Sequence, residues 1–115
     1  MDFSIDKKNI GFEQAKPFLL QESVQYADGS IVSKIVSEKD TGNVTLFAFD
    51  DGQFLSEHTA PFDALVQIVE GEAHITIGSQ EYNVKKGEMI VIPANIPHAV
   101  HAKKRMKMML IMIKS

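Results

Sequence analysis

The feature that most constrains this chain is the even spacing of its short apolar runs. From about residue 30 onward, these runs alternate with clusters of Gly, Asp, Asn and Pro at intervals of roughly ten residues. Such spacing is typical of an antiparallel sandwich or barrel, and no segment shows the longer period of an amphipathic helix. We therefore predict an all-β protein with strands at residues 31–37, 44–49, 53–58, 64–70, 73–77, 80–84, 89–92, 98–102 and 107–114.

The length predicts one domain that spans residues 1–115, because 115 residues can build one hydrophobic core but not two. Residues 1–30 differ from the rest, since their apolar pattern is irregular and is interrupted by Pro17. We predict an N-terminal arm or edge strand for this segment.

Charge and composition exclude several partners. The chain has 15 acidic and 12 basic residues and a net charge of -3, which argues against binding to nucleic acid or to anionic membranes. The one dense basic stretch, residues 103–105 with Lys107, is predicted to be a solvated turn. Without cysteine, a metal ion must be bound by nitrogen and oxygen atoms. The N-terminus has no apolar stretch of the signal-peptide kind, so we expect a cytoplasmic protein.

The last predicted strand is apolar on both faces, whereas a strand with one solvated face should alternate. Its outer face must therefore be covered. Either the N-terminal arm or a second subunit can cover it, and we favour a homodimer formed through this sheet.

Two blocks of the sequence, residues 52–71 and 87–102, each combine a leading glycine with a later histidine. They resemble the paired motifs of the cupin superfamily, and in particular those of small single-domain cupins of the cupin 2, RmlC-like kind. The resemblance implies a double-stranded β-helix, or jelly-roll barrel. The motif positions that match are Gly52, His58, Gly71, Gly87, Pro93 and His98.

The resemblance also shows which metal ligands are missing. Ala60 stands where the first motif has its second histidine, and Ala64 stands where it has a glutamate. Of the four ligands that the motifs imply, His58 and His98 remain. Two imidazoles are a poor cage for a first-row divalent ion, which usually has three or more protein ligands. A divalent transition metal on His58 and His98 is therefore kept as the less favoured cofactor, and no other cofactor is predicted.

Alternation along the strands predicts which side chains face the barrel interior. Glu57, Asp63, His74 and His101 have the opposite parity and are expected on the outside. For the larger apolar residues of the interior, plain core packing is an equal alternative. The predicted pocket, which suits a small apolar or aromatic molecule, comprises His58, His98, Phe54, Ser56, Ala60, Ala64, Val66 and Ile68.

Two functions remain open. The first is a protein of unassigned activity that binds a small molecule in the barrel, oriented by the two histidines. The second is an enzyme, either a metal-dependent dioxygenase or isomerase or a metal-free acid–base catalyst that uses His58 or His98. The lack of an interior carboxylate weighs against the enzyme, and no catalytic residue is assigned.

Overall fold

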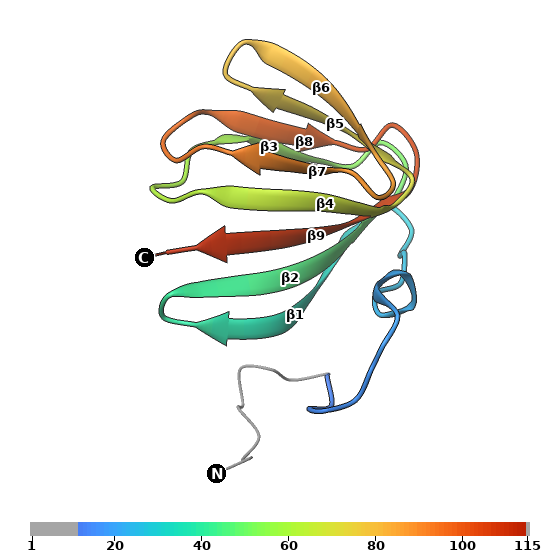
Figure 1. Ribbon diagram of the computed structural model, residues 1–115. Helices are drawn as coiled ribbons and strands as arrows, with labels where there is room; N and C mark the ends of the chain where they lie inside the picture. Colours follow the sequence, from blue (N-terminus) through green and yellow to red (C-terminus); the bar gives the residue numbers. More distant parts are fainter. Residues whose placement is uncertain (1–11, 115) are drawn as a thin grey trace.

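The computed structural model describes residues 12–114, which form two antiparallel sheets that share one core (Figure 1). One sheet has the strand order β1-β2-β9-β4-β7 and the other has the order β3-β8-β5-β6. A short 3-10 turn, η2 (Leu20–Glu22), precedes them. No helix among the described residues has the length and apolar character needed to span a membrane. The strands are β1 (Ile31–Lys39), β2 (Gly42–Phe49), β3 (Phe54–His58), β4 (Ala64–Glu70), β5 (Glu72–Ile77), β6 (Gln80–Lys85), β7 (Met89–Ile92), β8 (His98–His101) and β9 (Met106–Ile113).

The all-β prediction is confirmed. Each predicted run is a strand, and the ends differ by at most two residues from the predicted ones. Of the predicted N-terminal arm, residues 1–11 lie outside the described residues, and residues 12–30 contain no strand. The strands could be located because the chain alternates cleanly between β-forming runs and turn residues.

Alternate side chains of the strands face inward and build the core. In β4, Ala64, Val66 and Ile68 are buried, whereas the residues between them are half-exposed. In β5, which belongs to the other sheet, Ala73 and Ile75 are fully buried. Full burial of an isoleucine or valine side chain stabilises the fold by roughly 1.5–3 kcal/mol. The inward faces of the two sheets therefore provide most of the hydrophobic stabilisation.

The arm packs against the outer face of β1, β2 and β9, to the right of the sheets in Figure 1. Val24 is 3% exposed there and forms a second apolar cluster with Leu46 and Ala48 of β2. Leu20 and Met109 pack against the same cluster. The arm thus covers part of the face for which we expected a second subunit.

Lys107 lies under this arm, and its predicted place in a solvated turn is wrong. It is 6% exposed, because β9 begins at Met106 and turns Lys107 toward the arm. Its Nζ atom donates a hydrogen bond to the Gln21 carbonyl at 2.5 Å and lies 4.8 Å from the centre of the Tyr26 ring. The Tyr26 hydroxyl donates to Glu70, and burial together with this bond raises the pKa of Tyr26.

Beyond the arm, the same face remains apolar. The strand register places Val44, Ile111, Leu65 and Val91 in one row across β2, β9, β4 and β7. Val91 at the end of this row is 55% exposed. The homodimer stays a prediction, and this row is the surface through which it would form.

Candidate functional site: two histidines at the open end of the barrel

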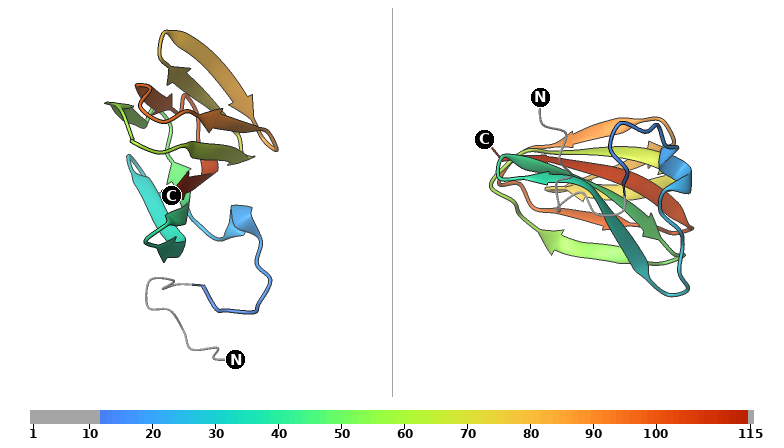
Figure 2. Two further views of the ribbon diagram at one scale, coloured as in Figure 1. Left: turned by 60° about the vertical axis from the view of Figure 1, so that its left-hand side comes forward. Right: turned by 90° about the horizontal axis from the view of Figure 1, so that it is seen from below.

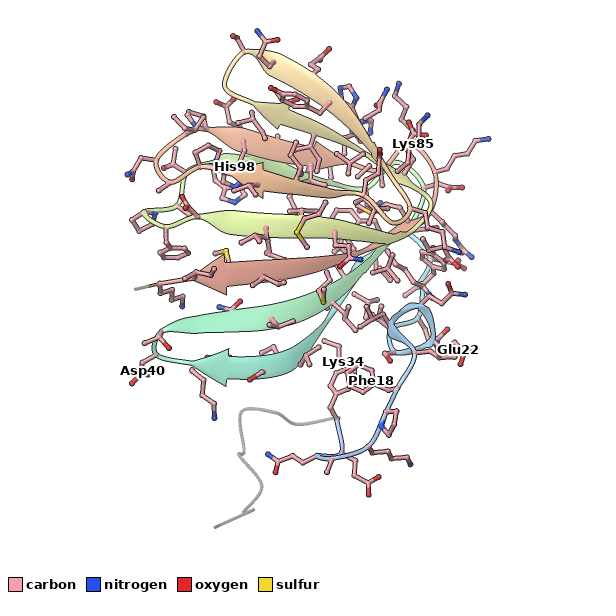
Figure 3. The ribbon with its side chains drawn as sticks, viewed as in Figure 1. Phe18, Glu22, Lys34, Asp40, Lys85 and His98 are labelled. Atoms are coloured by element: carbon pink, nitrogen blue, oxygen red, sulfur yellow. The ribbon has the colours of Figure 1, made fainter. Side chains whose placement is uncertain are left out.

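The two motif histidines lie next to each other. His58 at the end of β3 is paired with His98 at the start of β8, and their ring centres are 4.3 Å apart with an angle of 62° between the rings. His98 is 6% exposed, and His58 is exposed. In Figure 3, His98 lies at the same end of the barrel as Asp40 and opposite Lys85.

Backbone carbonyls orient both imidazoles. His58 Nδ1 lies 2.9 Å from the Ser56 carbonyl, and His98 Nδ1 lies 3.0 Å from the Ile96 carbonyl. A carbonyl oxygen can only accept, so each Nδ1 carries the hydrogen and donates it. In the neutral ring each Nε2 atom then has an unprotonated lone pair. The pair therefore presents two acceptors, one on the largely buried His98 and one on the exposed His58, that can bind a hydroxyl or amide hydrogen.

A bulge in β3 brings His58 to the inner face and corrects part of the predicted pocket. Phe54 pairs with His101 and Leu55 with Val100, but His98 then pairs with His58 and not with Glu57. The extra residue reverses the parity, so that Leu55 and His58 both face inward. Phe54 is 61% exposed and faces outward, and Ser56, within the bulge, is exposed. The prediction that Phe54 and Ser56 share the inner face of His58 is wrong.

The other predicted lining residues lie deeper or outside the strands. Ala64, Val66 and Ile68 are 2%, 1% and 0% exposed and belong to the packed core, which was the alternative reading for the larger two. Ala60 is in the loop after β3, where its carbonyl accepts a hydrogen bond from Asn95. The interior beneath the histidines is thus filled with side chains.

Burial falls along β5 and β9 toward the histidine end. Ile75 of β5 is 0% exposed, while Ile77, which faces the same way and pairs with His98, is half-exposed. In β9, Met108 is 1% exposed, while Leu110 and Met112 are half-exposed. We call this partly exposed end, made by His58, His98, Ile77, Leu110 and Met112, the mouth. The sequence analysis missed the last three, although alternation in β5 and β9 would have placed them inside.

Two loops hold the mouth in shape. Asn95 has φ +65°, a conformation that asparagine tolerates better than most residues, and it stands where the cupin motif has a glycine. Its backbone N–H donates to the Ala60 carbonyl at 2.7 Å, and the Ala94 backbone N–H donates to Asp63 Oδ1 at 2.9 Å. Asp63 therefore organises the loop before His98, a role that sequence reasoning missed.

The remaining two histidines lie on the outer face of the same sheet. His74 of β5 pairs with His101 of β8. His74 Nδ1 lies 2.9 Å from Asn83 Oδ1, and its Nε2 lies 3.4 Å from Glu81 Oε1. The residues on either side of His74, Ala73 and Ile75, are buried. One sheet thus carries an inner and an outer histidine pair.

A resident metal ion does not fit the donors of this site. The mouth offers two imidazole nitrogen atoms, and residues 12–114 contain no group of three or more histidine or carboxylate side chains that could hold a metal ion. Asp63, the carboxylate nearest in sequence to the missing glutamate, accepts a backbone hydrogen bond instead. A first-row ion usually needs at least three protein ligands for tight binding.

Comparison with known proteins agrees with this architecture. The model of the cupin domain family matches residues 45–114, which is more than half of the chain. A conserved protein of unknown function from Streptococcus pyogenes superposes with a TM-score of 0.90 at 33% identity, over 97% of this chain and 98% of that one. A cupin 2 conserved barrel domain protein from Leptotrichia buccalis has a TM-score of 0.81 at 44% identity and covers 84% of this chain but 47% of that one.

The protein belongs to the cupin domain family, and its fold is the jelly-roll barrel that the motifs implied. An uncharacterized protein of Streptomyces coelicolor is 32% identical over 59 residues, which cover 51% of this chain and 56% of that protein. The chain therefore matches little more than half the length of that curated relative. These relatives establish the family and the fold but transfer no activity.

Proposed function

We propose that this protein binds a small, mostly apolar molecule at the mouth of the barrel, where His58 and His98 accept hydrogen bonds from its polar group. The observation that carries this function is the facing pair of imidazoles, each fixed through Nδ1 by a backbone carbonyl and each left with a free Nε2. Because the rings are already oriented, a ligand does not have to order them on binding.

The surroundings of the pair favour an apolar guest. Ile77, Leu110 and Met112 are partly exposed and would lose contact with water when a ligand covers them. The packed residues beneath them, Ala64 and Val66, limit how deep a ligand can enter. A small ring or short chain with one hydroxyl or amide group satisfies both conditions.

The four histidines supply a matched test. A library of small aromatic and cyclic alcohols and amides is screened by ligand-observed NMR, and the affinity of each hit is then measured for His58→Ala and His98→Ala. We expect each substitution to weaken binding about tenfold, which corresponds to one lost hydrogen bond of about 1.4 kcal/mol. The control variants His74→Ala and His101→Ala should bind as the unaltered protein does. Equal losses in all four variants would rule out a site at the mouth.

Elemental analysis separates this function from a metal site. Protein purified without a metal-affinity step is measured before and after incubation with Zn²⁺, Ni²⁺ and Mn²⁺. We expect less than stoichiometric metal, since the mouth offers two imidazole ligands. Near-stoichiometric metal that is lost in both His58→Ala and His98→Ala would contradict the metal-free site.

A metal-free acid–base catalyst is the second candidate, and the exposure of His58 favours it. An imidazole with a free, accessible Nε2 atom is suited to remove a proton near neutral pH. If hits contain an acidic C–H bond, exchange of that hydrogen in D₂O distinguishes the two functions. Exchange that depends on His58 would indicate catalysis, whereas tight binding without exchange supports a binding protein.

We also propose that the chain forms a homodimer through the outer row of Val44, Ile111, Leu65 and Val91. A contiguous, partly exposed apolar surface of this kind is typical of protein interfaces. Analytical ultracentrifugation should give twice the monomer mass, and Val91→Lys should shift the equilibrium to monomer. The control Tyr82→Lys alters a comparably exposed residue of the other sheet, and a monomeric unaltered protein would refute the dimer.

A further inference from the structure

The end of the barrel opposite the histidines carries a basic hollow that no part of the proposed function uses. Three turns meet there: β4–β5 at Gly71, β6–β7 at Lys85 and Lys86, and β8–β9 at residues 103–105. They border a surface hollow of about 720 Å³, which we call the basic groove. Figure 3 shows Lys85 at this end, among several side chains that end in nitrogen.

Close backbone contacts hold the three turns together. Lys86 N donates to the Gly71 carbonyl at 3.1 Å, which joins the first two turns. Gly71 has φ +75°, and a Cβ atom at this position would lie 2.7 Å from the Arg105 carbonyl oxygen. Only glycine combines this conformation with so close an approach. The groove therefore has a fixed floor, made by segments that are more than ten residues apart in the sequence.

Arg105 anchors the third turn. Its Nε atom donates to Asp50 Oδ1 at 2.8 Å, its backbone amide donates to Asp51 Oδ1 at 2.6 Å, and its guanidinium also reaches Asp28 at 3.2 Å. Arg105 lowers the pKa of Asp50 to about 2, so the partner stays ionised over the physiological range. The charge of Arg105 is thus already matched by acidic residues.

The four lysines of the groove, unlike Arg105, lack acidic partners among the described residues. Within the described residues, the side chains of Lys85, Lys86, Lys103 and Lys104 form no ion pair. Among residues 12–114, Glu72 is the one acidic residue that lines the groove. This concentration of positive charge occurs in a chain whose net charge is -3, so it is not a consequence of overall composition. Like charges that line one hollow destabilise the free protein and favour a bound anion.

The wall also offers a neutral donor. Asn83 lines the groove, and its Oδ1 accepts a hydrogen bond from His74 Nδ1. This bond orients the amide of Asn83 and leaves its NH₂ group without a hydrogen-bond partner in the described part of the chain. Ammonium groups and amide N–H donors are the groups that bind phosphoryl oxygens.

We propose that the basic groove binds a small molecule that carries two or more phosphoryl groups. Four lysines facing one carboxylate require a ligand with several negative charges, and a hollow of about 720 Å³ accommodates a small molecule. The lysines of the groove gather at one end of an acidic protein, whereas nucleic-acid binding calls for a basic stripe along the surface. The site is separate from the mouth, so its failure and that of the proposed function are distinguishable.

Calorimetric titration with inorganic tripolyphosphate at low ionic strength tests the groove. We expect binding of one tripolyphosphate per chain, at least tenfold tighter than that of orthophosphate at the same ionic strength. The double variant Lys85→Gln/Lys103→Gln should lose at least tenfold in affinity. The control double variant Lys16→Gln/Lys114→Gln removes the same charge elsewhere on the described surface and should lose less than twofold.

Three results would overturn the site. Equal losses in the two double variants would mean that general electrostatic attraction drives binding, and equal affinity for orthophosphate would mean that no polyanion site exists. A single-stranded oligonucleotide that binds more tightly than tripolyphosphate would reassign the groove to nucleic acid. Circular dichroism confirms folding, and Lys86→Gln/Lys104→Gln replaces the first double variant if that one does not fold.

Discussion

The two ends of this barrel are built from the same strands but differ in packing and in chemistry. At the basic end, the inward residues Phe49, Ala73 and Met106 are fully buried. At the mouth, inward residues farther along the same strands, namely Phe47, Ile77 and Leu110, are only half-buried. The basic end is therefore closed by core packing and carries its charges outside, whereas the mouth leaves apolar side chains and two imidazoles within reach of solvent.

The turns at the two ends also differ in how closely they approach one another. Gly71 lets the β4–β5 turn approach the β8–β9 turn closely, which seals one end. At the other end, hydrogen bonds to Ala60 and Asp63 fix the loop around Asn95. The residues in the turns therefore determine which end of the barrel is accessible to solvent. Figure 2 shows the two sheets in a view turned by 60° and in a view from below.

The largest expected effect compares Ile75 with Ile77, two residues apart on the same face of β5. Ile75→Ala should lower the free energy of unfolding by roughly 3–4 kcal/mol, since it leaves a cavity in the closed end. Ile77→Ala should cost only about 1–2 kcal/mol, since half-buried surface contributes less and water can fill the gap. Urea denaturation measures both values. Equal losses would mean that the mouth is as tightly packed as the closed end.

The next effect concerns the turn that closes the basic end. Gly71→Ala should destabilise the protein by roughly 2–4 kcal/mol, from the strained positive φ and from the contact with the Arg105 carbonyl. Gly87→Ala is the control, because Gly87 has φ +86° but no atom within 4 Å of an added Cβ. It should cost only the conformational part, about 1–2 kcal/mol. Equal losses in urea denaturation would show that the close approach is unimportant.

A third prediction changes the chemistry of the mouth. Ala64→Glu restores the carboxylate that the cupin motif has at this position, and it should raise the affinity for Zn²⁺ at least about tenfold, or about 1.4 kcal/mol. Leu65→Glu adds the same group to the outer face of β4 and should leave zinc affinity unchanged. Because Ala64 is buried, the added charge should also lower stability, and zinc should restore it in this variant alone. Unchanged zinc affinity would place residue 64 away from the imidazoles.

The smallest effect is a pH dependence at the basic end. Arg105 and the Gly29 amide donate to Asp50 and lower its pKa from 3.8 to about 2. A carboxyl group whose pKa is lowered by folding stabilises the folded state at pH values above its ordinary pKa. This stabilisation is lost as the pH falls toward about 2. The difference in stability between the unaltered protein and Asp50→Asn should therefore shrink from about pH 4 to about pH 2.

Arg105→Gln provides the control for this pH dependence. In that background Asp50→Asn should show a weaker pH dependence, because the main donor to the carboxylate is absent. Denaturation at several pH values measures all four proteins. A difference that is constant with pH in the unaltered background would contradict the role of Arg105.

The fold was predictable because it depends on local signals. Alternation and turn residues placed every strand within two residues, and the paired motifs identified the family. The site was predictable only in part. His58 and His98 were placed together, but the β3 bulge reversed the parity of Phe54 and Ser56. A bulge adds one residue to a strand, and no characteristic residue type marks it in the sequence. Predictions that rely on the alternation of side chains therefore fail across a bulge.

The basic groove was beyond sequence reasoning for a different reason. Residues 103–105 were expected to be solvated, and nothing in the sequence brings them next to Lys85 and Lys86. That proximity follows from the strand order, in which β8 pairs with β5 and β9 with β4. Clusters made by topology appear only when all strand pairings are known.

The methionines of β9 differ in exposure, so their oxidation can serve as a probe of ligand binding in the barrel. Met106 and Met108 are sealed in the core, Met112 stands at the mouth, and Met89 of β7 is 47% exposed on the outside. Oxidation of methionine to its sulfoxide follows solvent access. Oxidation of Met89 thus reports the dose of oxidant, and oxidation of Met108, which shares a tryptic peptide with Met112, reports the loss of core packing. A molecule seated between the histidines would shield Met112 from oxidation, so mass spectrometry of one tryptic peptide could follow the filling of the barrel in a cell extract.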